Sequence, residues 1–334
     1  MFSLLMNKPG LTVSIIFIIL LLLHFNKASI FGNIAVPMKN QTSRFNDIRI
    51  AAVGDWGCKA ATQSTANLIS SKKPDLILGL GDFSYENDTG CWFKIMGPLI
   101  SKIKIVIGEH DFDPKNVSRL RDYTNRFNLS NPYYSFNYGN VHFLAMSSLI
   151  PFNNESLQYK LLRDETAQRE FVSNDLFSAS QNKSIHWIIV YLYKPMYSSP
   201  SQHASDESLR NIYHPLFDYY GVDLVLQAHN HNYQRSFPIR FNHTNSLNPV
   251  VTDRNISIYN HPNGTIFMVV GTGGSHQYNL LAKSPYIVTQ FQRFGFLNID
   301  ILQNGTKMVG TFFDSRDGKS KDQFVIFKRN HAWP

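Results

Sequence analysis

Short apolar runs and amphipathic stretches alternate along the chain from residue 48 onward. Strand-like runs at Ile48–Val53, Leu76–Leu80 and Ile103–Ile107 are each followed directly by a glycine and then by acidic or histidine residues. Helix-like segments lie between these runs, at about Thr62–Ser71 and Cys91–Leu99. Because short apolar runs that alternate with helical periods are typical of strand–helix units, this part of the chain is predicted to contain them.

The same alternation returns in the second half of the chain. The runs Tyr133–Tyr138 and Val141–Ser147 flank a Gly-Asn pair, which predicts a β-hairpin, and a polar helical stretch follows at about Glu155–Ser173. The segment Arg240–Gly264 holds two prolines and three glycosylation sequons and is predicted to be an exposed excursion. Further elements are expected at Ile185–Tyr191, Leu209–Tyr220 (a helix), Val222–Ala228, Ile266–Val270, Phe294–Ile301, Met308–Asp314 and Gln323–Lys328. Strands that alternate with helices twice over predict an α/β protein with two packed sheets.

The N-terminal residues are expected to lie outside the folded domain. Leu11–Leu23 is an unbroken stretch dominated by Ile and Leu, the length of a signal-peptide core and shorter than the roughly twenty residues of a membrane span. Cleavage after Ala28 would fit, although Asn26 is a poor residue for that site, so an uncleaved membrane anchor stays open. We therefore divide the chain into a signal peptide or anchor (1–28), a linker (29–47) and one domain (48–330), and expect the protein to be secreted or extracytoplasmic.

Composition agrees with export and argues against nucleic acid as a partner. The net charge is +8, but the lysines and arginines are scattered without a run or stripe. Ten sequons, at Asn40, Asn87, Asn116, Asn128, Asn154, Asn182, Asn242, Asn255, Asn263 and Asn304, favour a glycoprotein, although an asparagine-rich genome would also produce them. The two cysteines are compatible with one disulfide in an oxidising compartment.

Acidic and histidine residues gather where open α/β sheets place their sites, just past the carboxyl ends of strands. The motifs are GDWG at 54–57, GDFSY at 81–85, GEHD at 108–111 and AHNH at 228–231. Together they offer oxygen and nitrogen donors without thiolates, a set suited to iron, manganese or zinc. The phenol of Tyr85 favours ferric iron, since a strongly acidic ion is needed to bind it.

The spacing of these donors suggests more than one ion. His229 and His231, two positions apart in a tight loop, can point to different metals, and Asp82 could bridge them. Two metals about 4 Å apart clamp a phosphate and acidify a water, which is a known solution for phosphoester hydrolysis.

The ordered series GDWG, GDFSY, GEHD, IIVYLYKPMYSS and VDLVLQAHNHNYQR resembles the motif set of the purple acid phosphatases, within the calcineurin-like metallophosphoesterases. The likeness extends to YSF at 134–136 and VGTGG at 270–274 and covers about 48–328. The resemblance implies that 48–330 is a metallophosphoesterase domain, a two-sheet β-sandwich flanked by helices. It also implies hydrolysis of phosphomonoesters by metal-bound hydroxide.

The resemblance implies one complete metal site. Asp55, Tyr85 and His231 match its terminal ligands, and Asp82 matches the bridging carboxylate. The ion implied at this site is Fe(III).

The second, divalent site departs from the family pattern. His229 and Asp82 match, but Glu109 stands where the family has an asparagine ligand, and Tyr193 stands where it has a histidine. Tyr193 is expected to pack rather than to bind metal, because its phenol must lose a proton to bind a divalent ion. Fe(II), Mn or Zn could still occupy an altered second site; a mononuclear ferric site and a fold without catalysis are the alternatives.

Two further histidines receive roles from the resemblance. His110 matches the proton donor to the leaving group, and His203 falls in a loop where related enzymes place substrate-facing histidines. Cys58 and Cys91 follow the strands of the Asp55 and Asp82 motifs, so their loops should be neighbours and a disulfide is expected.

The implied partner is a small phosphorylated substrate, with the membrane contacted only through an uncleaved N-terminal segment. Two other functions stay open: a catalytically impaired binding or scaffold protein, and a phosphodiesterase or nucleotidase. The oligomeric state is not predicted.

Overall fold

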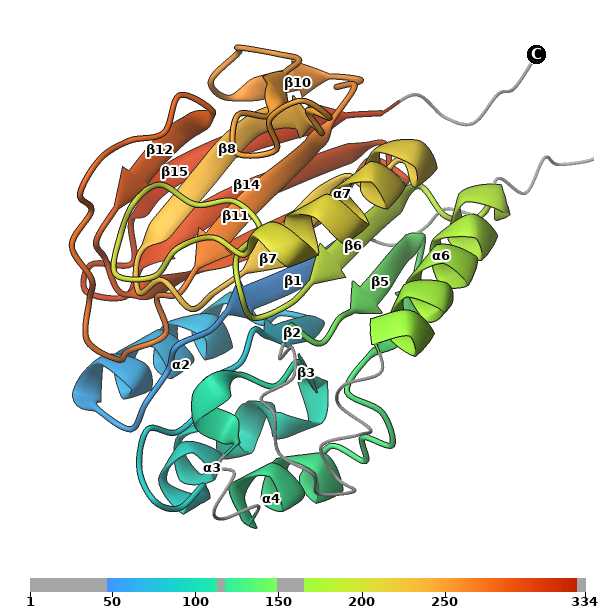
Figure 1. Cartoon of the computed structure of the whole chain (residues 1–334). Helices are drawn as coiled ribbons and strands as arrows, with labels where there is room; N and C mark the ends of the chain where they lie inside the picture. The colour runs from blue at the N-terminus through green and yellow to red at the C-terminus, as the bar shows by residue number, and fades with distance from the viewer. Residues whose placement is uncertain (1–46, 113–117, 149–164, 329–334) are drawn as a thin grey trace, which may run out of the picture. The chain divides into compact units, whose positions relative to one another are not determined.

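Two mixed β-sheets form the framework of the domain in a computed structural model, which describes residues 47–112, 118–148 and 165–328 (Figure 1). The seven-stranded sheet has the order β10-β15-β14-β13-β1-β2-β3. The eight-stranded sheet has the order β12-β8-β11-β7-β6-β5-β4, with β9 paired to β8. The predicted α/β class, with two sheets flanked by helices, is confirmed.

The strand bounds of the seven-stranded sheet are β10 Ile258–Asn260, β15 Ser320–Phe327, β14 Lys307–Asp314, β13 Gly295–Leu302, β1 Ile48–Val53, β2 Leu76–Gly79 and β3 Ile103–Ile105. Those of the eight-stranded sheet are β12 Ile287–Phe291, β8 Tyr233–Arg240, β11 Thr265–Val270, β7 Leu224–Gln227, β6 Trp187–Tyr191, β5 Val141–Ala145, β4 Tyr134–Tyr138 and β9 Val250–Val251. The helices are α2 Ala60–Lys72, α3 Gly90–Met96, α4 Ser118–Arg126, α6 Glu165–Gln181 and α7 Glu207–Tyr220, with short 3-10 helices η1 Gly97–Lys102 and η2 Glu109–Asp111.

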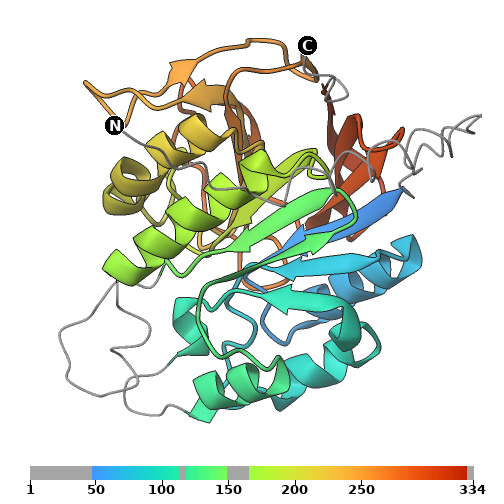
Figure 2. The same cartoon turned by 90° about the vertical axis from the view of Figure 1, so that its right-hand side faces the viewer.

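Apolar side chains from both sheets form one core between them. Ile77 of β2 and Ile299 of β13 belong to it, as do Ile189 of β6 and Met268 of β11. A second core joins the outer face of the eight-stranded sheet to α6 and α7, which lie side by side (Figures 1 and 2). In the eight-stranded sheet, the continuous apolar strands β5, β6 and β7 are buried on both faces, because one face meets each of these cores.

Each sheet contains a run of parallel strands. β1, β2 and β3 are parallel neighbours in one sheet, and β5, β6, β7 and β11 in the other. Their carboxyl ends therefore gather at one edge of each sheet, where the GDWG, GDFSY, GEHD and AHNH motifs begin.

Several described elements depart from the sequence prediction: α4, β9 and β12 were not expected, and three further differences have a physical reason. Arg240–Gly264 is not wholly an exposed excursion, because it contains β10, whose Tyr259 is fully buried at the sheet edge. β8 was not predicted, since its buried Gln234 and Arg235 hide the apolar pattern of a strand. The helix expected at Glu155–Ser173 lies outside the described residues up to 164 and continues beyond its predicted end to Gln181.

Cys58 and Cys91 are joined by a disulfide, with their Cα atoms 5.8 Å apart. The bond connects the loop that follows β1 to the first turn of α3. Asp55, a candidate site residue, precedes Cys58 by three residues, so the disulfide anchors the loop that carries it.

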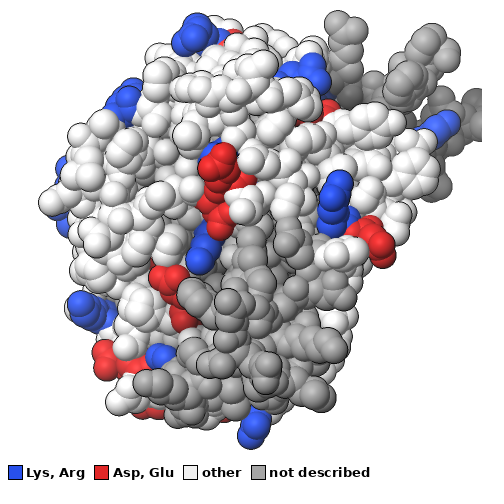
Figure 3. Space-filling view, in the orientation of Figure 1, with Lys and Arg blue, Asp and Glu red and all other residues white. Residues whose placement is uncertain are grey.

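The charged surface is sparse on the face shown in Figure 3, where lysines and arginines are scattered, some of them beside acidic residues, and form no continuous basic patch. None of the helices in 47–112, 118–148 and 165–328 has both the length and the apolar character needed to cross a membrane. The segment predicted as signal peptide or anchor, and the linker up to residue 46, lie outside the described residues.

A buried ion pair ties the two sheets together. Arg235 of β8 donates from Nε to Asp322 Oδ2 at 2.6 Å and from Nη2 to Asp322 Oδ1 at 2.8 Å, and Asp322 belongs to β15. Arg235 is 1% exposed, so its charge depends on this carboxylate for compensation.

We expect Asp322→Asn to lower the free energy of unfolding by about 3 kcal/mol, because the substitution leaves the Arg235 guanidinium buried without a counter-charge. Chemical denaturation followed by circular dichroism measures this. Asp317→Asn is the matched control, since Asp317 pairs with Lys321 on the surface and its loss should leave the midpoint unchanged. Equal, small shifts in both variants would show that the inter-sheet pair does not stabilise the fold.

Candidate metal centre

The loops that follow five strands meet at one place between the sheets. Asp55 follows β1, Asp82 follows β2 and Glu109 opens η2 after β3, all from the seven-stranded sheet. His229 and His231 follow β7 of the eight-stranded sheet, and Tyr193 follows β6. The Asp55 N–H donates to Gly81 O at 3.1 Å and the Trp56 N–H donates to Asp82 O at 2.9 Å, so the first two loops are bonded to each other.

The Tyr85 hydroxyl is the centre of an inner cluster. It lies 3.2 Å from Asp55 Oδ1, 3.1 Å from Asp82 Oδ2 and 2.9 Å from His231 Nε2. His231 Nε2 is in turn 3.4 Å from Asp55 Oδ1. All four residues that the resemblance assigns to the ferric site are thus brought together.

These separations fit a single cation. With metal–ligand bonds of about 2.1 Å, neighbouring ligands lie about 3.0 Å apart in an octahedral site and about 3.4 Å apart in a tetrahedral one. Asp55 Oδ2 is buried and has no hydrogen-bond partner among the described residues, a costly state that a cation would relieve. A Cβ on Gly271 would press against this same oxygen, so the backbone closes tightly around the carboxylate.

The backbone holds three of the predicted ligand residues in unusual conformations. Asp55, Asp82 and His229 have φ angles of 57°, 53° and 69°, in the left-handed region that side chains other than glycine rarely adopt. Such strain is typical of functional sites, where surrounding contacts enforce it.

Asp111 holds the backbone around Asp82 in this conformation. Its carboxylate accepts the backbone N–H groups of Asp82, Phe83 and Gly108, each at 2.8 Å. Burial raises the pKa of Asp111 to about 7, and the three N–H donors work against that rise. Asp111 therefore fixes the loop of Asp82 against η2 without pointing at the cluster.

Negative charge is concentrated in the inner cluster. Burial, together with the charges of Asp55 and Asp111, raises the pKa of Asp82 well above its usual range. Burial raises the pKa of the Tyr85 phenol, and the negative charges of Asp55 and Asp82 raise it further. A cation would reverse both effects, because it favours the charged form of each ligand.

His231 is oriented by a contact that the sequence prediction did not include. Its Nδ1 donates to the carbonyl of His276 at 2.6 Å, which leaves Nε2 directed at Tyr85. Burial lowers the pKa of His231, but Asp55 and this carbonyl outweigh it, and the net shift is upward. The Tyr278 ring stacks on the His231 ring, with their centroids 3.9 Å apart. His276 and Tyr278 follow the VGTGG motif directly, a position that could have marked them as site residues.

Tyr193 lies at the side of the cluster where the second ion was expected. Its hydroxyl donates to Asp82 Oδ2 at 2.5 Å and lies 2.8 Å from His229 Nδ1. Burial, reinforced by Asp82 and Asp55, raises the pKa of this phenol well above its usual value, so it keeps its proton. The Tyr193 hydroxyl thus engages both Asp82 Oδ2 and His229 Nδ1, the two atoms that a cation shared by these residues would need.

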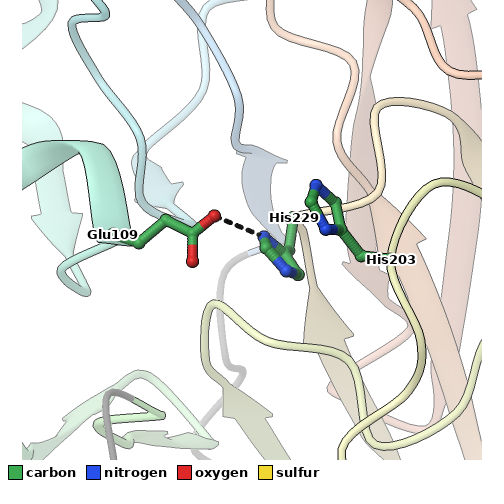
Figure 4. A group of neighbouring side chains, drawn as sticks. All are labelled: Glu109, His203 and His229. Atoms are coloured by element: carbon green, nitrogen blue, oxygen red, sulfur yellow. Dashed lines mark ion pairs between the residues drawn. The ribbon is translucent and has the colours of Figure 1, made fainter. Parts of the chain in front are cut away.

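An outer group of donors borders the same histidine. Glu109, His203 and His229 each offer a ligand atom, and all three atoms lie within 4.8 Å of one another (Figure 4). Glu109 Oε1 is 3.4 Å from His229 Nδ1, and the rings of His203 and His229 stack with centroids 3.9 Å apart. Burial lowers the pKa of His203, and burial together with His203 lowers that of His229 to about 3, so both rings are neutral near pH 7.

His110 lies at the rim of the inner cluster. Its backbone N–H donates to Asp82 Oδ1 at 2.8 Å, and its ring centroid is 4.4 Å from that of Tyr85. Burial lowers the pKa of this imidazole. The ring is therefore anchored through its own backbone to the residue predicted to bridge the metals.

Comparison with known proteins gives consistent results. The sequence profile of calcineurin-like phosphoesterases matches residues 48–233. Purple acid phosphatase 23 of Arabidopsis thaliana is 26% identical over 294 residues, covering 73% of this chain and 58% of the relative. The chain spans about half the length of the curated relatives it matches, with 58%, 45% and 56% of three plant phosphatases covered.

Solved structures share the fold. A purple acid phosphatase from yellow lupin (Lupinus luteus) seeds superposes with a TM-score of 0.66 at 20% identity, covering 85% of this chain and 54% of the lupin chain. GAP50, the anchor in the inner membrane complex of Plasmodium, gives a TM-score of 0.62 at 18% identity, covering 85% and 90% of the two chains. With more than half of its length matched by the family profile, the chain belongs to the calcineurin-like phosphoesterases, and within that family it resembles the purple acid phosphatases.

Proposed function

We propose that the chain is a metal-dependent phosphatase that hydrolyses phosphomonoesters. The observation that carries this proposal is the inner cluster, in which the Tyr85 hydroxyl lies within 3.2 Å of an atom of each of Asp55, Asp82 and His231. The chemistry of the donors also supports it, since carboxylate, phenol and imidazole suit iron better than a soft metal.

The inner cluster would hold Fe(III), and Fe(II), Mn or Zn would occupy an altered second site. When bound, these ions would supply Lewis acidity toward a phosphate and lower the pKa of a water molecule. The role of the chain is to orient the donors before substrate arrives. Asp111 holds the Asp82 loop, and the His276 carbonyl fixes the tautomer of His231.

His110 would give its proton to the leaving alkoxide. Its ring lies against Tyr85 and the residue is exposed, so it borders both the inner cluster and the side open to solvent. His203, on the loop opposite, would meet the substrate at the other side of the cluster. The substrate class that follows is a small phosphorylated molecule, in agreement with the phosphatases among the relatives.

Export of the protein is also proposed. The Cys58–Cys91 disulfide is a bond typical of oxidising compartments, and the apolar stretch at 11–23 has the length of a signal-peptide core. Six of the sequons, at Asn87, Asn128, Asn182, Asn255, Asn263 and Asn304, have exposed asparagines that an exported chain could present for glycosylation.

A catalytically impaired binding protein is the second candidate. Tyr193 favours it, because this residue stands where the family has a histidine ligand of the second metal, and its hydroxyl engages both Asp82 and His229. The two functions share the fold and the first cation, and they differ in turnover.

Purified protein supplied with iron, manganese or zinc should hydrolyse p-nitrophenyl phosphate. We expect Asp82→Ala to lower kcat/KM by more than about 100-fold, because it removes the carboxylate that the inner cluster shares. Asp317→Ala, a change on the surface, is the control. Absence of hydrolysis with all three metals would overturn the phosphatase proposal and favour the binding protein, whereas turnover of a phosphodiester alone would change the substrate class.

Iron-loaded protein should show a visible absorption band from charge transfer between the Tyr85 phenolate and Fe(III). We expect Tyr85→Phe to abolish the band while Tyr219→Phe, at a position 81% exposed, retains it. Absorption spectroscopy with iron content measured in parallel checks this. Colourless protein that contains stoichiometric iron, or a band that survives in Tyr85→Phe, would contradict a ferric site at Tyr85.

A further inference from the structure

The Tyr193 hydroxyl lies where a second cation shared by Asp82 and His229 would have to lie. It is 2.5 Å from Asp82 Oδ2 and 2.8 Å from His229 Nδ1. A cation bonded to both atoms at about 2.1 Å would have to compete with this hydroxyl for the same two donor atoms. The Tyr193 ring is 1% exposed and packed in the core between the sheets, so the hydroxyl has little freedom to withdraw.

Donors for a divalent ion nevertheless remain beside His229, whose Nδ1 lies 3.4 Å from Glu109 Oε1. Figure 4 shows Glu109 and His203 on either side of His229, each brought in by a different segment of the chain. Their ligand atoms and that of His229 lie within 4.8 Å of one another, close to the span of about 4.2 Å that one ion allows between opposite ligands. The Glu109 side chain is 38% exposed and can adjust over the remaining distance.

The position of His203 is built into the fold. Asn230, fully buried between the two histidines of the AHNH loop, accepts the His203 N–H at its Oδ1 at 3.0 Å and donates from Nδ2 to the His203 carbonyl at 2.9 Å. The backbone of His203 is therefore held directly beside His229. At the outer edge, His203 Nε2 lies 3.4 Å from the Tyr278 hydroxyl, the kind of contact that fixes the tautomer of a ligand histidine.

We propose that a second divalent cation binds to Glu109, His203 and His229, outside the Tyr193 hydroxyl and without sharing Asp82. One carboxylate and two imidazoles form a set that zinc accepts in catalytic sites, with a further position left for water or a phosphate oxygen. The role of this ion in hydrolysis rests on the proposed function, but its binding does not. In this arrangement His203 reaches a phosphate through the cation rather than by direct contact.

Zn²⁺ titration of the purified chain by calorimetry, with bound metal counted by mass spectrometry, tests the outer site. We expect two ions per chain, and one ion in His203→Ala and in Glu109→Gln, with the outer affinity falling at least about tenfold. His243→Ala is the matched control, since His243 is an exposed histidine outside the site. Circular dichroism verifies folding, and His203→Gln replaces His203→Ala if the latter unfolds.

Electron paramagnetic resonance of the Mn²⁺-loaded chain tests whether the two ions share a carboxylate. The wild-type chain should show two uncoupled ions, and Tyr193→His should move the outer ion to Asp82 and produce an exchange-coupled pair. A coupled pair in the wild-type chain, a single ion at saturation, or a second ion that persists in both His203→Ala and Glu109→Gln would each overturn the inference.

The two proposals fail separately. Hydrolysis of phosphomonoesters by a chain with one bound ion would exclude the outer cation site and leave the phosphatase proposal intact. Binding of two ions as described without turnover would exclude the phosphatase proposal and leave the outer cation site intact.

Discussion

The geometry of the site depends on one buried carboxylate, that of Asp82. Its Oδ2 accepts hydrogen bonds from Tyr85 and Tyr193, and its Oδ1 accepts the backbone N–H of His110. Burial and the nearby charges of Asp55 and Asp111 raise its pKa, so an isolated carboxylate here is unfavourable. Each partner of Asp82 offsets part of this cost, and a cation would offset most of it. A cation bound at this site would therefore stabilise the buried carboxylate.

The two-sheet fold forms this site by bringing together the ends of strands, and the loops that follow them, from both sheets. Parallel strands of both sheets end at the cluster, and the disulfide and the Asp111 carboxylate hold the loops that leave them. Three of the proposed ligand residues, Asp55, Asp82 and His229, adopt left-handed backbone conformations there. A local sequence does not favour this conformation by itself, so the contacts of the packed sheets must maintain it.

Patterns local in sequence predicted most of the strands and the inner ligands. Ile48–Val53 and Leu76–Gly79 are recognisable because both of their faces are buried, and the acidic residues follow them within a few positions. β8 escaped prediction because Arg235 is neutralised by Asp322, which lies 87 residues away. The support that His231 receives from the His276 carbonyl also comes from a distant loop, and no periodicity marks it.

The kinds of donor atom and their order along the chain follow from the sequence, because each donor comes directly after a strand and strands align at their ends. The number of cations that these donors can share does not follow from it. That depends on the Tyr193 hydroxyl between Asp82 and His229, and on Asn230, which binds the backbone of His203. Both contacts join segments far apart in sequence at hydrogen-bond distance, and only the packing of the two sheets sets such distances.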